Sequence, residues 1–454
     1  MIFSLWQHIE RDAQKIIKMN LGYNLPYKFC RIFVRFAFRS NYRKRIYVND
    51  EIVPKDVPVI FAPNHRNAVI DGLTLVSYYG KNIVFLARAD FFKSKFLRIL
   101  FNFLNVTPIY RSRDGMNNLS KNEEVFDLCG KILSRKNPIC LFPEGKHSPK
   151  QSLLPIQKGV PRIALPTEQY MDFNLNIHIV PTIIYYSDIH GFLSDYYVFF
   201  CKPIKTCDYK DLYQQNPPAA INQMRNDIEK EMKKEMIDIT NDAYYNFYQY
   251  CIDFCSDKVA KEKFPKEKDA IPKACKLIIN RLDDLLKNDN SIFLQTVNYY
   301  GRAFSILANF GLTSKDKLQR TNCFSIFSRL IGLILISPLA IYGLINGIFP
   351  IITYFAVRSK VKDQQFISSL RVAVAVFILP IFFILQTVLV GCLTHSFVNA
   401  LIYLSLLSPT LLLGCYWRKW FKDLFRRIKV NKFIKKHTDE WKFVMKLIDY
   451  HTWL

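Results

Sequence analysis

Residues 57–71 read VPVIFAPNHRNAVID, a short apolar run that gives way at Pro63 to polar residues. Such a run, bounded by a turn signal, is typical of a strand buried in a parallel sheet. Similar runs follow at Ile83–Ala87, Thr107–Arg111, Ile139–Phe142 and Ile177–Ile183, with helical patterns between them at Lys93–Leu104, Asn122–Ser134 and Gly159–Leu165. This alternation predicts an α/β domain over residues 46–205, with a mostly parallel sheet flanked by helices.

The C-terminal third predicts a membrane domain over residues 323–420. Residues 372–392 and 397–416 are apolar runs, and about 20 such residues cross the hydrocarbon core. The short polar link between them predicts a transmembrane hairpin. The apolar stretch 330–357 is broken by several Pro and Gly residues, so we expect it to be re-entrant or interfacial rather than a single span.

The charge of the chain indicates an anionic partner. Lys and Arg number 63 and Asp and Glu 38, which gives a formal charge of +25. The basic residues flank the apolar runs, and residues 421–454 form a basic amphipathic tail. This arrangement favours membrane lipid over nucleic acid, for which no motif is present. Because cationic flanks stay cytoplasmic, we expect an integral membrane protein with its catalytic domain on the cytoplasmic side.

Residues 1–45 predict amphipathic helices at the membrane interface. Over residues 27–39, one face carries Phe and Ile side chains and another carries Arg and Lys at spacings of three and four. Basic amphipathic helices of this kind tend to lie in a lipid interface. The alternative is a helix that packs on its own domain. Residues 206–322 are predicted to be a charged, helical segment.

A candidate general base lies directly after the first strand. His65 follows Asn64, and Asp71 and Asn67 lie close behind it. A His at a strand-to-helix junction is open to substrate, and a carboxylate can fix its tautomer. Such a pair can take a proton from an alcohol. Taken alone, a His with a nearby Asp is also a common chance occurrence.

Other candidate site residues follow later strands. Arg111 and Arg113 could hold a phosphate through charge-assisted hydrogen bonds, although a solvated turn is an equal alternative. Glu144 and Gly145 follow the strand at 139–142, and Glu144 could position an acceptor. Lys158 precedes a helix start, where backbone N–H groups suit an anion. Val180-Pro181 is a candidate wall for an acyl chain, with core packing as the alternative.

Together these motifs resemble the glycerolipid acyltransferase family, which includes glycerol-3-phosphate and 1-acylglycerol-3-phosphate acyltransferases. The matching pieces are Asn64-His65 with Asp71, Arg111, Phe142-Pro143-Glu144-Gly145 and Val180-Pro181. Five residues separate His65 from Asp71 where four are usual, a form that a subgroup of longer members shares, and Asn67 fits that subgroup. A second departure is Lys146-His147, where a Thr-Arg pair is common.

The resemblance implies an O-acyltransferase of phospholipid biosynthesis. His65 would be the catalytic base and Asp71 its partner. Substrate-binding residues would be Asn64, Asn67, Arg111, Arg113, Glu144, Gly145 and Lys158. The acceptor would be a phosphorylated glycerol and the donor an acyl thioester, either acyl-CoA or acyl carrier protein, with no bound cofactor and no metal. The alternatives are a lysophospholipid-remodelling acyltransferase and a catalytically inactive membrane interaction module.

Overall fold

The computed structural model describes residues 25–79, 82–88, 106–109, 119–316 and 318–449. The chain divides into two units. The first contains the chain up to Met236 together with Lys362–Val372, and the second contains Ile237–Val361 and the chain from Ala373 onward. A short segment from the apolar C-terminal third thus belongs to the first unit.

The first unit is built on an eight-stranded sheet. Its strands are β1 Tyr42–Val48, β2 Val59–Pro63, β3 Val84–Arg88, β4 Val106–Ile109, β5 Ile139–Cys140, β6 His178–Tyr186, β7 Ser194–Phe200 and β8 Ile204–Lys205. The order is β1-β7-β6-β2-β5-β3-β4, with β8 pairing on β6. All neighbours are parallel except β6 with β7 and β6 with β8. The predicted α/β fold with a mostly parallel sheet is confirmed.

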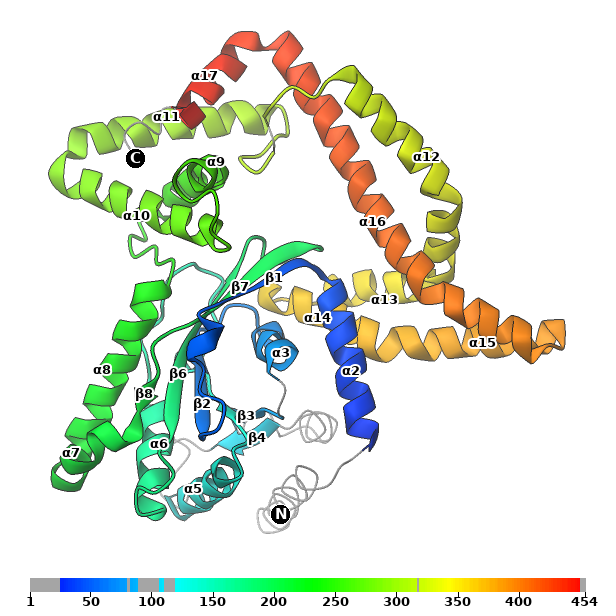
Figure 1. Cartoon of the computed structure of the whole chain (residues 1–454). Coiled ribbons are helices and arrows are strands. Elements are labelled where there is room, and N and C mark those ends of the chain that lie inside the picture. Colours follow the sequence, from blue (N-terminus) through cyan, green and yellow to red (C-terminus); the bar gives the residue numbers. More distant parts are fainter. Residues whose placement is uncertain (1–24, 80–81, 89–105, 110–118, 317, 450–454) are drawn as a thin grey trace. The chain divides into compact units, whose positions relative to one another are not determined.

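Helices flank this sheet, with α8 on one side and α2 and α3 on the other (Figure 1). The helical elements are α2 Leu25–Ser40, η1 Asp50–Ile52, α3 Val69–Tyr78, α5 Leu119–Ser134, α6 Gly159–Tyr170, η5 Thr206–Tyr209, α7 Lys210–Gln215, α8 Pro217–Glu235, η6 Gln364–Phe366 and α14 Ile367–Ala373. All residues of β2, β6 and β7 are buried, so the core lies at the centre of the sheet. The helix predicted over Lys93–Leu104 lies outside the described residues.

The sequence patterns do not predict β1 and β7, which form one end of the sheet. Strand β1 contains three consecutive basic residues, Arg43-Lys44-Arg45, and among the described strands it pairs with β7 alone. Charge on an edge strand discourages pairing with other chains. Arg43 also donates two hydrogen bonds to Asp195 of β7, at 2.9 and 2.5 Å. The charged residues that interrupt the apolar pattern of these strands therefore have a role at the edge of the sheet.

Helix α2 turns its arginines toward its own domain. Arg35 donates through Nε to the carbonyl of Val76 at 2.8 Å, and Arg39 donates through Nη2 to the carbonyl of Ser77 at 2.7 Å. Both carbonyls lie in the last turn of α3, where helical carbonyls lack intrahelical partners. The exposed side chains on the apolar face include Ile32 at 64% and Phe36 at 59%. The basic face packs on the domain, and the interfacial role of α2 stays a prediction.

The second unit is helical. Its elements are α9 Tyr245–Lys263, α10 Ala270–Asn288, α11 Asn290–Asn309, α12 Cys323–Asn346, α13 Ile348–Arg358, the π-helical turn η7 Val374–Ile378, α15 Leu379–Thr394, α16 Phe397–Lys436 and α17 Thr438–Asp449. In the part of the chain that the structure describes, three helices are long and apolar enough to cross a membrane: Cys323–Asn346, Gln364–Thr394 and Phe397–Lys436. The predicted hairpin lies within the last two. The stretch 330–357 is divided at Gly347 into α12 and α13.

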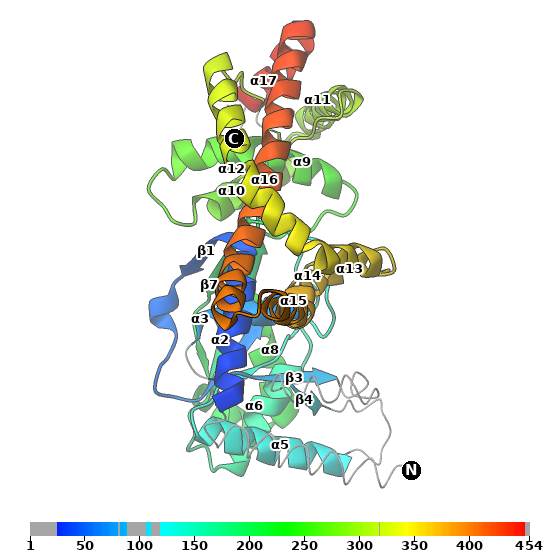
Figure 2. The same ribbon diagram turned by 90° about the vertical axis from the view of Figure 1, so that its right-hand side faces the viewer.

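Helices α12 and α16 approach each other closely, and both views show them crossing (Figures 1 and 2). A Cβ atom added to Gly343 would lie 2.1 Å from the carbonyl oxygen of Thr410, and one added to Gly414 would lie 2.8 Å from that of Ala340. Small residues allow such approach of helix backbones in lipid, where tight packing replaces the hydrophobic effect. The glycines therefore set the spacing of this helix pair.

Replacing Gly343 by Ala should separate α12 from α16, because the added methyl group would overlap the backbone of α16. Overpacking of this kind costs about 1–3 kcal/mol, so the melting temperature of the purified protein in detergent should fall. Gly332, in the same helix, has no atom within 4 Å of an added Cβ. Gly332→Ala is the matched control and should keep or raise the melting temperature. Equal effects of the two substitutions would contradict the close packing.

Candidate active site

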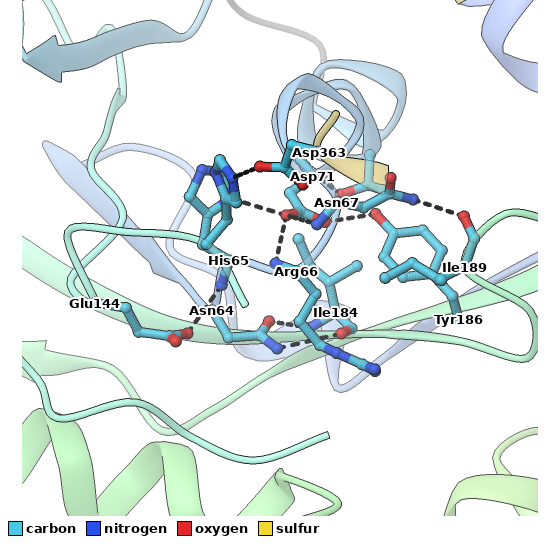
Figure 3. A network of polar contacts seen from close by, with 12 residues as sticks. Asn64, His65, Arg66, Asn67, Asp71, Glu144, Ile184, Tyr186, Ile189 and Asp363 are labelled. Carbon is cyan, nitrogen blue, oxygen red and sulfur yellow. Dashed lines mark hydrogen bonds and ion pairs between the residues drawn. The ribbon is translucent and has the colours of Figure 1, made fainter. Parts of the chain in front are cut away.

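The candidate base and its carboxylate meet where β2 runs into α3. His65 lies two residues beyond the end of β2, and Asp71 lies in the first turn of α3. The Nδ1 atom of His65 is 2.9 Å from Oδ2 of Asp71 (Figure 3). The side chain of His65 is 17% exposed and that of Asp71 is fully buried. No described residue hydrogen-bonds Nε2 of His65.

Asp71 is fixed by further donors. Its Oδ2 accepts from the backbone N–H groups of Arg66 at 2.8 Å and Asn67 at 2.7 Å. Its Oδ1 accepts from the hydroxyl of Tyr186 at 2.7 Å. Burial, with Asp71 nearby, raises the pKa of Tyr186 well above its usual value, so the hydroxyl keeps the proton that it donates. Tyr186 is not among the residues predicted from the sequence, because nothing local connects it to a motif 115 residues away.

Asn64 and Asn67 hold the backbone around the base. The amide of Asn64 accepts from the N–H of Ile184 at 2.7 Å and donates to its carbonyl at 3.3 Å, which ties the end of β2 to β6. The amide of Asn67 donates to the carbonyl of Ile189 at 3.1 Å. Both asparagines are fully buried. They shape the loop of His65, while their direct contact with a substrate stays a prediction.

Glu144 joins this loop to the one that follows β5. Its Oε1 accepts from the N–H of His65 at 2.9 Å, and its Oε2 accepts from the N–H of Leu154 at 3.3 Å. Burial raises the pKa of Glu144 to about 7. The hydrogen bonds from the two N–H groups act in the opposite direction and lower this pKa, but burial has the larger effect. Gly145 has φ +68°, a left-handed conformation that suits glycine. Glu144 is therefore a buried link between the two loops.

Two aromatic rings border His65. The ring of Phe142 stacks on it, with centroids 4.0 Å apart and planes at 19°. The ring of His147 stands at 88° to it, with centroids 5.5 Å apart. Oδ2 of Asp363 lies 2.9 Å from Nε2 of His147. Asp363 comes from the Lys362–Val372 segment, and no sequence pattern predicts its place beside His147.

The remaining predicted residues lie in different settings. Lys158 is the N-cap of α6, and among the described residues its side chain has no hydrogen-bond or ion-pair partner. Val180 and Pro181 are buried in β6 opposite Phe61 and Ala62 of β2, as core packing requires. Arg111 and Arg113 lie outside the described residues. In the described part of the chain, no three His, Cys, Asp or Glu side chains gather as metal ligands would.

Comparison with known proteins matches the same part of the chain. Residues 44–185 match the model of the family described as Acyltransferase. This stretch, which is less than half of the chain, contains His65, Asp71, Glu144 and almost all of β2 to β6. No curated protein matches the chain.

Among solved structures, the chain is similar to the crystal structure of the 1-acyl-sn-glycerophosphate acyltransferase PlsC from Thermotoga maritima. The identity is 16% and the TM-score is 0.33. The similarity covers 48% of this chain and 87% of that protein.

The raised pKa of Glu144 predicts a pH-dependent stability. The native carboxyl group keeps its proton up to a pH of about 7, whereas the unfolded one, with a pKa of 4.5, releases it earlier. The unfolded state therefore binds fewer protons in this window, and the free energy of unfolding falls as pH rises through it. Relative to Glu144→Gln, the native protein should lose on the order of 3 kcal/mol between these pH values.

Denaturant unfolding of both proteins in detergent, from pH 4.5 to pH 8, measures this difference. Glu51, an exposed carboxylate of the same unit, supplies the control Glu51→Gln, whose unfolding should run parallel to that of the native protein. A Glu144→Gln profile that also runs parallel to the native one would show that Glu144 is not a buried, neutral acid.

Proposed function

We propose that this protein is a membrane-bound O-acyltransferase of phospholipid biosynthesis. It would move a fatty acyl group from an acyl thioester to a hydroxyl of glycerol 3-phosphate or 1-acylglycerol 3-phosphate. The observation that carries the proposal is the pairing of His65 with the buried Asp71 inside the acyltransferase domain, with Nε2 of His65 unpartnered among the described residues. The match to the Acyltransferase family model supports the reaction class.

The proposed reaction uses His65 as a general base. Nε2 of His65 takes the proton from the acceptor hydroxyl as its oxygen attacks the thioester carbonyl. Asp71, which accepts from Nδ1, fixes the tautomer and stabilises the imidazolium that forms. The carbon–sulfur bond of the tetrahedral intermediate then breaks, and the departing thiolate takes the proton from His65. The acceptor is activated directly, so no acyl-enzyme is needed.

The other site residues would bind the substrates. Arg111, assisted by Arg113 or Lys158, would hold the phosphate of the acceptor through charge-assisted hydrogen bonds. Glu144 would position the acceptor by fixing the backbone of His65. The donor would be acyl-CoA or acyl carrier protein, both of which present the same thioester. Val180 and Pro181 remain candidates for the wall of an acyl chain.

The apolar helices would hold the enzyme in the membrane, with the catalytic domain on the cytoplasmic side. No candidate span lies among the described residues between Met236 and Asn322, so Asn322 would share the side of the catalytic domain. Lys362–Val372 packs with that domain, so the chain between would cross an even number of times. Helix α13 has 11 residues, about 16 Å, too short for a core of about 30 Å. This supports a re-entrant α12–α13 pair.

Replacing His65 by Asn should lower turnover by roughly 100- to 10,000-fold, the usual contribution of general base catalysis. The assay uses purified protein, labelled palmitoyl-CoA, and a panel of glycerol 3-phosphate, 1-acylglycerol 3-phosphate and neutral lysolipids. His395→Asn, in the exposed turn before α16, is the matched control and should retain activity. A folded His65→Asn protein with normal turnover would refute the mechanism. Preference for neutral lysolipids would favour a remodelling enzyme.

Replacing Arg111 by Ala should raise the KM for the acceptor more than the KM for the donor, because a hydrogen bond to a charged group contributes about 1.5–3 kcal/mol. Arg111→Lys should restore only part of the loss, since an ammonium lacks the planar fork of the guanidinium. The control is Arg135→Ala, at an exposed position after α5. Steady-state kinetics with each substrate varied in turn measure these constants. An unchanged acceptor KM in both Arg111 variants would exclude Arg111 from the phosphate site.

A further inference from the structure

A segment from between the apolar helices completes the surroundings of His65. Lys362–Val372, here called the docked segment, packs with the α/β unit, although the chain before and after it belongs to the helical unit. It follows α13 and leads into η7 and α15. The acyltransferase domain of residues 44–185 therefore does not contain every residue of its own site.

The C-terminal half of the docked segment is anchored to the loop between β6 and β7. The hydroxyl of Ser368 donates to the carbonyl of Ile189 at 2.8 Å, and Nη2 of Arg371 donates to the carbonyl of His190 at 2.6 Å. The carbonyl of Ile189 also accepts from Asn67. Gln365, Ile367, Ser368 and Val372 are buried. One carbonyl thus joins the loop of His65 to the docked segment.

The N-terminal half of the docked segment reaches His147. Asp363 lies 2.9 Å from Nε2 of this ring, and the ring of Phe366 stands at 85° to it with centroids 5.4 Å apart. The ring of His65 is another neighbour of the His147 ring, with centroids 5.5 Å apart. Figure 3 shows Asp363 and His65 on the same side of the network. Asp363 and Phe366 together hold the His147 ring beside the base.

The contact with Asp363 decides which atom of His147 is left for a substrate. Nε2 is engaged, and no described residue hydrogen-bonds Nδ1. When the ring is protonated, both nitrogens donate, one to Asp363 and the other to an anion. The side chain of Asp363 is 46% exposed, and exposed ion pairs add little to stability. Its Oδ1 also accepts from the N–H of Gln365 at 3.0 Å, so Asp363 caps the turn that follows it. The effect of Asp363 should therefore fall on the orientation of His147 and on the local order of the docked segment.

We propose that Asp363 is a positioning residue of the acceptor site, which fixes the His147 ring so that Nδ1 contacts the phosphate of the acceptor next to His65. This inference rests on the proposed acyl transfer to a phosphorylated glycerol. Phe366 packs edge-on against the His147 ring, and Ser368 and Arg371 hold the docked segment in place. The acceptor site is thus shared between the acyltransferase domain and a segment that joins apolar helices.

The test compares Asp363→Ala with Asp363→Asn in the full-length protein. Asp363→Ala should raise the acceptor KM about 10-fold, the usual effect of one lost hydrogen bond to a charged group, and should leave the donor KM unchanged. Asp363→Asn should retain most of the acceptor affinity, because its amide oxygen can still accept from Nε2. Adding Asp363→Ala to His147→Ala should have no further effect. Asp56→Ala, an exposed carboxylate elsewhere in the unit, is the control.

Calorimetric titration with glycerol 3-phosphate and with 1-acylglycerol 3-phosphate, without donor, separates this inference from the proposed function. Weaker binding by Asp363→Ala supports the positioning role even if the native protein transfers no acyl group, a result that would refute the function alone. Equal binding by the native protein and Asp363→Ala would overturn the positioning role. So would additive effects of the His147 and Asp363 substitutions, or a donor KM that rises as much as the acceptor KM.

Discussion

The carboxylate of Asp71 is the group on which the candidate site depends. It has no exposed surface, and it accepts from one ring nitrogen, two backbone N–H groups and one hydroxyl. A buried carboxylate without donors would be very costly, so these four groups must keep their positions together. This arrangement strains the backbone of the loop at Ala68, whose φ of +43° is unfavourable for a residue other than glycine. The geometry of the base therefore follows from the need to satisfy one buried charge.

The sequence predicts the central part of this arrangement because its signals are local. A buried strand, a His at its end and an Asp in the next helix lie within 15 residues, and residues 139–145 repeat the pattern of strand and acidic turn. Tyr186 and Asp363 carry no such signal. Their partners are 115 and 216 residues away, and a Tyr in a buried strand reads as core. Only the order of strands in the sheet brings β6 beside β2 and so places Tyr186 on Asp71.

Helix α2 illustrates a different limit of sequence reasoning. Its spacing of Arg and Phe defines two faces but does not say which one is turned inward. The arginines reach the carbonyl groups at the end of α3, which need donors because a helix leaves its last carbonyls unpaired. Burying a basic face is favourable only when such acceptors are present, and they belong to another element. In that orientation, the exposed Ile and Phe side chains of α2 are the ones that would contact a lipid interface.

The docked segment explains why the helical unit cannot be regarded as an anchor alone. Removing the apolar helices would remove Asp363, Phe366, Ser368 and Arg371 from the loops that they contact. The loop of His65 would lose a shared hydrogen bond at Ile189, and His147 would lose its partner on Nε2. The chain enters this segment from α13 and leaves it toward α15, both of which are apolar helices of the second unit. Residues that contact the loops of His65 and His147 therefore come from two parts of the sequence, one before and one after α12 and α13.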